Sequence, residues 1–261
     1  MARSLNLIGA VHYVLGQYAK AEQDWEKALQ IFQDLGNRQQ GMDLLNNLGA
    51  IADARGDHEA AFQRYHNALE IAREIGYRDG EILFLTNRGL EQVTLGNYGA
   101  GEADLQQAIQ LAGVTGSWCL PITFNYHAEA LLGLGRYKEA LYSAKQALVL
   151  GEEDKTPEYI GMAWRTLGMV ADKLRKPFRT RDRETRKFKN YDANACFAKS
   201  EKIFAEAEIE MERARTLREW AKSRLRVENQ EQAQKMWREA REIFARLGAD
   251  MEVQRMADLP T

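Results

Sequence analysis

The sequence has little cysteine and no long apolar run. Its two cysteines, Cys119 and Cys196, are too few for a disulfide framework and are not spaced as zinc ligands. There is no run of about 18 apolar residues and no pattern typical of a secretory signal, so we expect a cytoplasmic protein without a membrane span. The chain is 45% hydrophobic and 28% charged with a formal net charge of -2, a composition typical of soluble globular proteins.

Proline is also scarce, with only four residues in 261: Pro121, Pro157, Pro177 and Pro260. The stretches between them are rich in alanine, leucine, glutamate, glutamine, lysine and arginine, which favour helices. Alternating runs of β-branched and aromatic residues, which would indicate strands, are not evident. The sequence therefore predicts an all-α protein.

A period of about 40 residues organises the chain. Small residues recur in three series, which are Gly9, Gly49 and Gly89, then Gly16, Gly56, Gly96 and Gly135, and finally Ala28, Ala68, Ala108, Ala147, Ser200 and Ala240. The third series advances by 40, 40, 39, 53 and 40 residues, so the fifth unit carries an insertion of 13 residues.

Each unit is expected to form two helices. In the second unit, Gly49 lies in an apolar-periodic stretch, Gly56 interrupts it, and Ala61, Tyr65 and Ala68 then share one helical face. Gly49 and Ala68 would let the two helices approach closely, and Tyr65 would fill the space left by their missing side chains.

These series resemble the tetratricopeptide repeat in a longer, 40-residue form. The long form is similar to repeats of kinesin light chains, of cell-polarity scaffolds and of sensor regions in bacterial signal-transduction ATPases and transcription activators. The resemblance implies a right-handed superhelical solenoid of about six helix-turn-helix repeats with a concave groove lined by the first helix of each pair. We expect one domain over residues 1–261, with repeats at about 2–37, 38–77, 78–117, 118–155, 157–208 and 209–248 and a closing helix at 249–258.

The first helix carries an apolar face that no preceding helix covers. Leu7, Val11 and Val14 form it, in addition to a core face at Leu5 and Ile8. Three explanations stay open, which are an upstream repeat in a larger protein, self-association through this face as a homo-oligomer, and an intact short chain. Resemblance favours a part of a larger signalling or scaffold protein.

The sequence offers no recognisable catalytic or metal site. There is no phosphate-binding Gly-x-x-x-x-Gly-Lys-Ser/Thr loop, no His-Glu-x-x-His arrangement and no Gly-x-Ser-x-Gly elbow. The four histidines, His12, His58, His66 and His127, are interpreted mainly as ordinary surface residues of helices. We therefore expect no enzyme activity, no cofactor and no metal.

Polar residues at the repeat period suggest a binding surface. In Leu45-Asn46-Asn47-Leu48 the leucines are needed inside, so one asparagine should face the groove. The period extends this position into a line along the concave surface, formed by Asn6, Asn46, Thr86, Asn125, Arg165 and Arg218. Asn47 and Asn87 lie beside it.

Amide side chains both donate and accept hydrogen bonds, so such a line could bind the backbone of a peptide. Similar Leu-Asn-Asn-Leu stretches line the peptide-binding groove of kinesin light chains, and this resemblance implies that Asn46, Asn47 and Asn87 are the best-matched candidates. The alternative is that the asparagines solvate a helix face or bond to a neighbouring helix. Arg165 and Arg218 could recognise an acidic ligand, or could form salt bridges to neighbouring helices.

The insertion in the fifth unit is strongly basic. Residues 173–189 hold nine lysines and arginines against Asp182 and Glu184, and the basic patch comprises Arg175, Lys176, Arg179, Arg181, Arg183, Arg186, Lys187 and Lys189. With Pro177 inside it, the segment is predicted to be a loop between paired helices. A solvated loop is the favoured interpretation. Binding to nucleic acid or an acidic surface is the less favoured alternative, because only Phe178 and Phe188 are interleaved.

Together these features predict a non-enzymatic module that binds a peptide or protein segment in its concave groove. A self-associating structural solenoid and an adaptor that uses residues 173–189 are the two rival interpretations.

Overall fold

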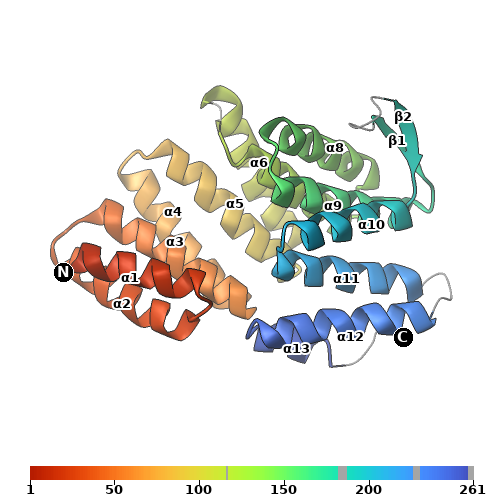
Figure 1. The fold of residues 1–261 in the computed structure, drawn as a ribbon. Helices are drawn as coiled ribbons and strands as arrows, with labels where there is room; N and C mark the ends of the chain where they lie inside the picture. Colours follow the sequence, from red (N-terminus) through yellow and green to blue (C-terminus); the bar gives the residue numbers. More distant parts are fainter. Residues whose placement is uncertain (116, 182–186, 226–229, 258–261) are drawn as a thin grey trace. The chain divides into compact units, whose positions relative to one another are not determined.

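The computed structural model describes residues 1–115, 117–181, 187–225 and 230–257, and they form thirteen helices and two short strands. Figure 1 shows that consecutive helices form antiparallel pairs. The chain folds as two compact units, Met1–Cys119 and Leu120–Thr261. The single solenoid expected over residues 1–261 therefore stays a prediction, and each unit is described separately. None of the described helices is both long and apolar enough to cross a bilayer.

The first unit contains three helix pairs. The helices are α1 (Ala2–Val14), α2 (Tyr18–Asp34), α3 (Arg38–Arg55), α4 (His58–Glu74), α5 (Arg78–Thr94) and α6 (Tyr98–Thr115). Each pair falls within one of the first three expected repeats.

The second unit also contains three pairs, of which the second carries a β-hairpin. Its elements are α7 (Leu120–Gly133), α8 (Tyr137–Asp154), α9 (Pro157–Leu174), β1 (Phe178–Arg181), β2 (Phe188–Tyr191), α10 (Ala193–Glu206), α11 (Glu210–Leu225), α12 (Gln230–Arg246) and the closing helix α13 (Asp250–Arg255). The fold is thus an α-helical repeat structure, as predicted.

The glycines of the first helices allow the close approach that the sequence suggested. A Cβ atom added to Gly49 would lie 2.6 Å from the Tyr65 ring, and one added to Gly9 would lie 2.6 Å from the Trp25 ring. In the third pair, a Cβ atom on Gly89 would meet Leu105 at 2.7 Å. These separations are shorter than van der Waals contact, so the partner side chain occupies the space that any larger residue would need.

The alanine series marks the opposite wall of each interface. Its members are almost fully buried: Ala28, Ala68, Ala108, Ala147, Ser200 and Ala240. Ser200 interrupts the series with a hydroxyl group, which donates to the Gly161 carbonyl at 2.8 Å and lies 3.0 Å from the Thr216 hydroxyl. A buried hydroxyl needs such partners, because leaving it without a hydrogen bond costs free energy.

Most helices end at a residue in the left-handed conformation, which glycine adopts without a steric penalty. Gly56 after α3, with φ of 80°, is an example. Three non-glycine residues replace glycine in this role, Lys155 after α8, Arg175 after α9 and Glu208 after α10, with φ between 52° and 57°. At Glu208 the chain turns, so α10 and α11 are separate helices.

The basic insertion is not simply a loop. Its described residues form an antiparallel pair in which Phe178 lies opposite Tyr191 and Arg181 opposite Phe188. Phe178 and Tyr191 are buried at the root of this hairpin, with ring centroids 6.3 Å apart. The prediction that no strands occur was wrong here.

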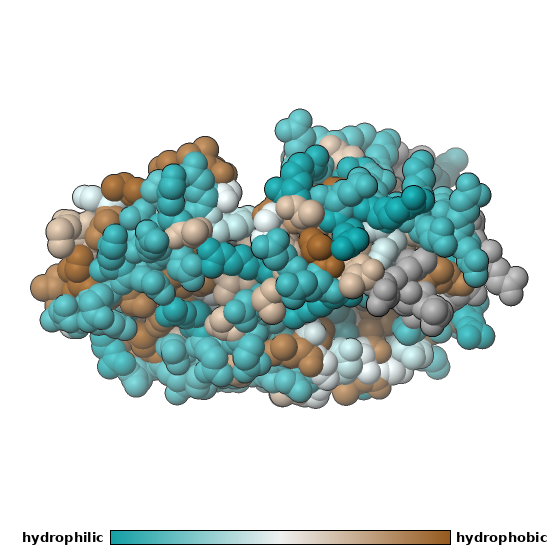
Figure 2. Space-filling view, turned by 90° about the horizontal axis from the view of Figure 1, so that it is seen from below, coloured by the Kyte–Doolittle hydropathy of each residue, from teal (hydrophilic) through white to brown (hydrophobic). Residues whose placement is uncertain are grey.

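The exposed apolar face of α1 is present as predicted. Leu7, Val11 and Val14 have exposed fractions of 70%, 58% and 83%, and Figure 2 shows apolar patches that interrupt a mainly hydrophilic surface. Ile8 was expected in the core, but its side chain is 47% exposed, so that prediction is wrong. At the other end, α13 closes the last pair, with Met256 buried and its carbonyl accepting a hydrogen bond from Trp237 Nε1 at 3.2 Å.

We expect Gly49→Leu to lower the free energy of unfolding by about 1–3 kcal/mol, because the new side chain overlaps the Tyr65 ring. Urea denaturation monitored by circular dichroism measures this change. Gly99→Leu is the control, since Gly99 lies in helix α6 and a Cβ atom there meets nothing within 4 Å. Equal stabilities of the two variants would contradict the packing argument.

Candidate functional site

The first helices of the first unit present a half-buried polar face. On α3, Asp43, Asn46 and Asn47 are half-buried at helical spacing, and Leu83 and Asn87 have the same burial on α5. Gln40 donates to the Asp43 carboxylate at 3.3 Å. Partial burial raises the pKa of this carboxylate above its ordinary value.

The structure brings together two of the predicted asparagines. Asn87 Nδ2 donates to Asn46 Oδ1 at 3.0 Å, which links α5 to α3. One amide NH2 group and one amide carbonyl of this pair remain without a partner among the described residues, and Asn47 lies next to it. Asn6 is half-buried on α1, and its backbone carbonyl accepts a hydrogen bond from Trp25 Nε1 at 3.0 Å.

Two other members of the predicted line are buried, so the line is not continuous. Thr86 is 0% exposed and its hydroxyl donates to the Ile82 carbonyl at 2.9 Å. Asn125 is 1% exposed and donates to Glu129 at 3.2 Å. Both side chains are therefore inaccessible to a ligand. The prediction that Thr86 and Asn125 belong to a line on the concave surface is wrong.

Arg165 is also buried rather than available in a groove. Its Nη1 lies 2.5 Å from Glu212 Oε2, and its Nη2 lies 4.0 Å from Glu129 Oε1. Arg215 adds a second contact to Glu212 at 2.8 Å. The alternative of a salt bridge to a neighbouring helix is therefore correct for Arg165, which ties α9 to α11.

The two glutamates in this network differ in electrostatic environment. Burial would raise the pKa of Glu212, but Arg165 and Arg215 outweigh that effect and lower it to about 2. For Glu129, burial is the dominant effect and raises its pKa, although Arg165 and a hydrogen bond from Thr166 oppose the change. The network thus keeps a charged carboxylate at Glu212.

Arg218 makes a similar structural contact. Its Nη1 lies 2.6 Å from Glu252 Oε2 and its Nε lies 3.1 Å from Glu219 Oε1. The first contact joins α11 to the closing helix α13. Arg218 therefore forms salt bridges within the protein, which was the alternative to recognition of an acidic ligand.

The histidines are not all on the surface. His58 is 2% exposed, and its Nδ1 lies 2.8 Å from Glu91 Oε2 and 3.5 Å from Asp53 Oδ1. These three potential ligand atoms lie within 4.8 Å of one another, a spacing compatible with a metal ion. The direct contact between His58 and Glu91 already explains their proximity, so we assign this cluster to packing between α3, α4 and α5.

The basic patch surrounds the hairpin. Its described members are exposed, and they are Arg175, Lys176, Arg179, Arg181, Lys187 and Lys189. The Arg179 guanidinium lies over the Phe188 ring, 5.0 Å from its centroid. Arg183 and Arg186 lie outside the described residues.

The hairpin is fixed to the helices at its root. The Tyr191 ring lies 4.8 Å from the Trp164 ring of α9, and the Lys199 ammonium lies over both. Lys145 of α8 donates to the Arg179 carbonyl at 2.8 Å. Burial lowers the pKa of Lys145.

Sequence reasoning missed several polar pairs that span two paired helices. Arg88 binds Asp104 through two 2.7 Å contacts, and His127 lies 2.9 Å from the Ser143 hydroxyl. Both pairs are separated by 16 residues, the same offset as Gly49 and its packing partner Tyr65. Polar residues separated by 16 positions in the sequence could therefore have been predicted to form pairs.

We expect Glu212→Gln to destabilise the protein by about 3–5 kcal/mol at pH 7, because Arg165 loses its anionic partner. The pKa of Glu212 is lower in the folded protein than its ordinary value, so its stabilising charge is present at neutral pH and is lost as the pH falls through about 4.5 toward 2. The difference between the two proteins should therefore shrink by about 1 kcal/mol between pH 7 and pH 3.5.

Urea denaturation at both pH values measures this difference. Glu139→Gln is the control, because Glu139 is exposed and pairs with Arg136 where water screens the interaction. A difference that does not change with pH would show that Glu212 is not the charged partner.

Comparison with known proteins agrees with this architecture. Residues 1–74 match the tetratricopeptide repeat family model. The apo form of RapI has a TM-score of 0.77 at 15% identity, over 98% of this chain and 84% of that chain. No curated protein matches the chain in sequence.

Two other solved structures share the fold. A Rap protein complexed with Competence and Sporulation Factor has a TM-score of 0.65 at 17% identity, over 94% of this chain and 64% of that chain. BtubC (BKLC) from P. vanneervenii has a TM-score of 0.59 at 18% identity, over 79% of this chain and 80% of that chain. Residues 1–74 thus match the tetratricopeptide repeat in sequence, and the chain shares the fold of these solved structures.

Proposed function

We propose that this protein is a non-enzymatic interaction module that binds a peptide or protein segment along the first helices of its pairs, in the groove expected for stacked repeats. The observation that carries this proposal is the bond between Asn87 and Asn46, at 3.0 Å, on the half-buried face of α3 and α5. We propose that the side-chain amides of Asn46, Asn47 and Asn87 contact the ligand.

The chemistry of the pair suits an extended backbone. Once Asn87 Nδ2 donates to Asn46 Oδ1, the Asn46 NH2 group can donate to a peptide carbonyl and the Asn87 carbonyl can accept from a peptide N–H. The bond between them limits the rotation of both side chains, which lowers the entropic cost of binding. Such contacts recognise the backbone and leave selectivity to other groups.

Fold similarity supports the same class of function. The Rap protein with a TM-score of 0.65 was solved in a complex with Competence and Sporulation Factor. At least one protein with this fold therefore binds a partner. The ligand of the present chain is proposed from its amides and not from that partner.

We expect the triple variant Asn46→Ala, Asn47→Ala, Asn87→Ala to retain its fold and to lose a ligand captured by the wild type. The residues are half-buried and their loss creates no large cavity, so the melting temperature should change little. Pull-down from a host lysate, followed by mass spectrometry, compares the captured proteins, and circular dichroism checks the fold.

Asn67→Ala is the control, because Asn67 is an exposed asparagine on α4, the second helix of its pair. It should capture the same proteins as the wild type. Identical captured proteins in the wild type and the triple variant would refute the amide site, and unfolding of Asn46→Ala alone would show that this asparagine is structural.

A second candidate function is self-association through the exposed face of α1. Leu7, Val11 and Val14 are 70%, 58% and 83% exposed, and burial of such side chains against a second copy would be favourable.

If this face associates, light scattering should show a mass that rises with protein concentration. Leu7→Glu combined with Val11→Glu should abolish that rise, because glutamate is costly to desolvate in an apolar interface. A constant monomer mass at all concentrations would exclude this role.

A further inference from the structure

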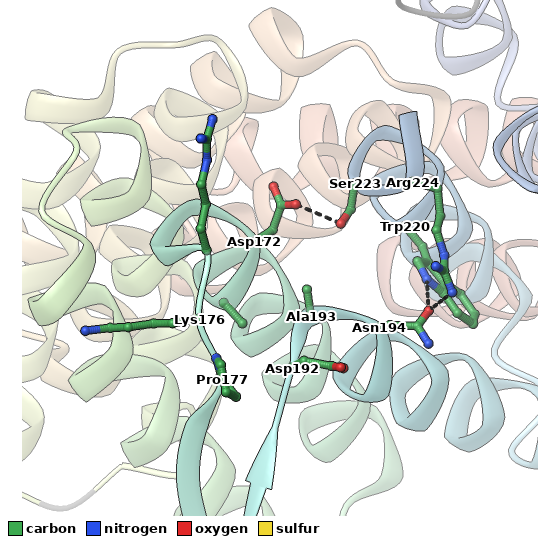
Figure 3. A pocket seen from close by; sticks show the side chains of 11 residues that line it. Asp172, Lys176, Pro177, Asp192, Ala193, Asn194, Trp220, Ser223 and Arg224 are labelled. Carbon is green, nitrogen blue, oxygen red and sulfur yellow. Dashed lines mark hydrogen bonds between the residues drawn. The ribbon is translucent and has the colours of Figure 1, made fainter. Parts of the chain in front are cut away.

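A cavity of about 810 Å³ lies within the second unit, between the end of α9, the root of the hairpin, the start of α10 and the end of α11. Figure 3 shows Asp172, Trp220 and Ser223 around this space, with the Asn194 side chain hydrogen-bonded to both Trp220 and Arg224. The volume is in the range of ligand pockets in proteins.

The two acidic side chains of the lining are already engaged within the chain. Asp172 accepts a hydrogen bond from the Ser223 hydroxyl at 2.8 Å. Asp192 caps helix α10 and accepts from the Ala195 backbone N–H at 2.8 Å. Their negative charge is therefore partly stabilised before any ligand binds.

The cations of the lining have fewer partners. Arg175 and Lys176 are exposed and form no ion pair with any described residue. Arg224 donates through Nη2 to the Asn194 side-chain carbonyl, but its buried Nε–H has no acceptor in the described part of the chain. The lining therefore holds three cations, which can contact an anion, against two carboxylates that already have partners.

Arg175 occupies a costly backbone conformation. It follows α9 with φ of 52°, in the place where Gly16, Gly56, Gly96 and Gly135 follow the first helices of other pairs. Glycine avoids a steric penalty that arginine incurs there. Arg175 is also the one of the three non-glycine residues with positive φ that lines the cavity.

Trp220 supplies a fixed apolar wall. Its Nε1 donates to the Asn194 side-chain carbonyl at 2.9 Å, and its ring lies nearly parallel to the Phe197 ring at 6.4 Å. Pro177 and Ala193 add further apolar surface to the lining. The cavity thus combines a flat apolar wall with positive charge.

We propose that this cavity binds an acidic segment of a protein partner, in which separate carboxylates contact Arg175 and Arg224 and a neighbouring apolar side chain packs on Trp220. This inference rests on the proposed function, because it adds a side-chain-selective site to a module whose asparagines contact only backbone. The exposed cations of the hairpin extend the positive surface beyond the cavity.

A protein segment fits these observations better than a nucleic acid. Phe178 and Tyr191 are buried, so Phe188, 61% exposed with the Arg179 guanidinium over its ring, is the one aromatic side chain of the hairpin strands that could stack on a base, whereas binding of single strands uses several such rings.

The test uses the full chain and a fluorescein-labelled dodecapeptide in which glutamates alternate with leucine and glycine. Fluorescence anisotropy measures its Kd for the wild type and for Arg175→Gly. We expect this substitution to raise the Kd at least fivefold and also to raise the melting temperature, because glycine relieves the strained conformation. Loss of binding in a more stable protein cannot be explained by unfolding.

Lys155→Gly is the matched control, because Lys155 is an exposed cation with φ of 56° in the same unit and does not line the cavity. It should raise the melting temperature without changing the Kd. If both variants raised the Kd equally, binding would depend on general charge attraction and not on Arg175, and the proposal would be overturned.

Further probes separate the remaining outcomes. A peptide with glutamine in place of glutamate should not bind, and a twelve-nucleotide deoxythymidine strand should bind more weakly than the acidic peptide. Tighter binding of the strand, or no binding of the acidic peptide at millimolar concentration, would overturn the proposal. The asparagine triple variant should bind the acidic peptide normally, so failure of this site is distinguishable from failure of the amide site.

Discussion

The structure depends on the close contact between a glycine of one helix and a large side chain of its antiparallel partner. Gly9 with Trp25, and Gly49 with Tyr65, set the same offset of 16 residues between paired helices. Once this register is fixed, polar groups at the same offset meet without further adjustment, as Arg88 and Asp104 do at 2.7 Å. The repeat therefore determines both apolar packing and the placement of buried charge.

The fold could be predicted from the sequence because its signals are redundant. The helix pairs are indicated by glycine at the turns, by small residues at the interfaces and by apolar periodicity, all with one period. The turn at Glu208 is less evident because it lacks glycine, although its φ of 57° gives the geometry that glycine provides elsewhere. The sequence near this turn is compatible with a helix, and packing of the two pairs decides against it.

The candidate site could be predicted only in part, because adjacent residues on a helix face different directions. Thr86 lies one period after Asn46 and is buried, whereas its neighbour Asn87 reaches Asn46. Rotation by about 100° per residue means that a shift of one position changes the exposed face. The steps that lead to Asn125 and Arg165 are 39 and 40 residues, so even a nearly constant period does not fix the exposed face, and tertiary packing buries both side chains.

The cations of the second unit fall into two groups that composition cannot distinguish. Arg165 and Arg213 bind carboxylates of other helices, with Arg213 contacting Glu201 at 2.9 Å and Glu239 at 2.5 Å. Their charges are used to hold helices together, and removing one partner would leave a charge without compensation. By contrast, Arg175 and Lys176 at the hairpin root form no ion pair with the residues that the structure describes.

Net charge conceals this difference, since the chain as a whole is close to neutral. The hairpin itself is fixed by Tyr191 against Trp164 and by Lys145, so its basic residues are not required to hold it in place. A segment whose anchoring uses aromatic rings and one lysine can keep its arginines exposed at little cost in stability. That separation between anchoring residues and exposed charge is what makes the hairpin root suited to contact an acidic partner.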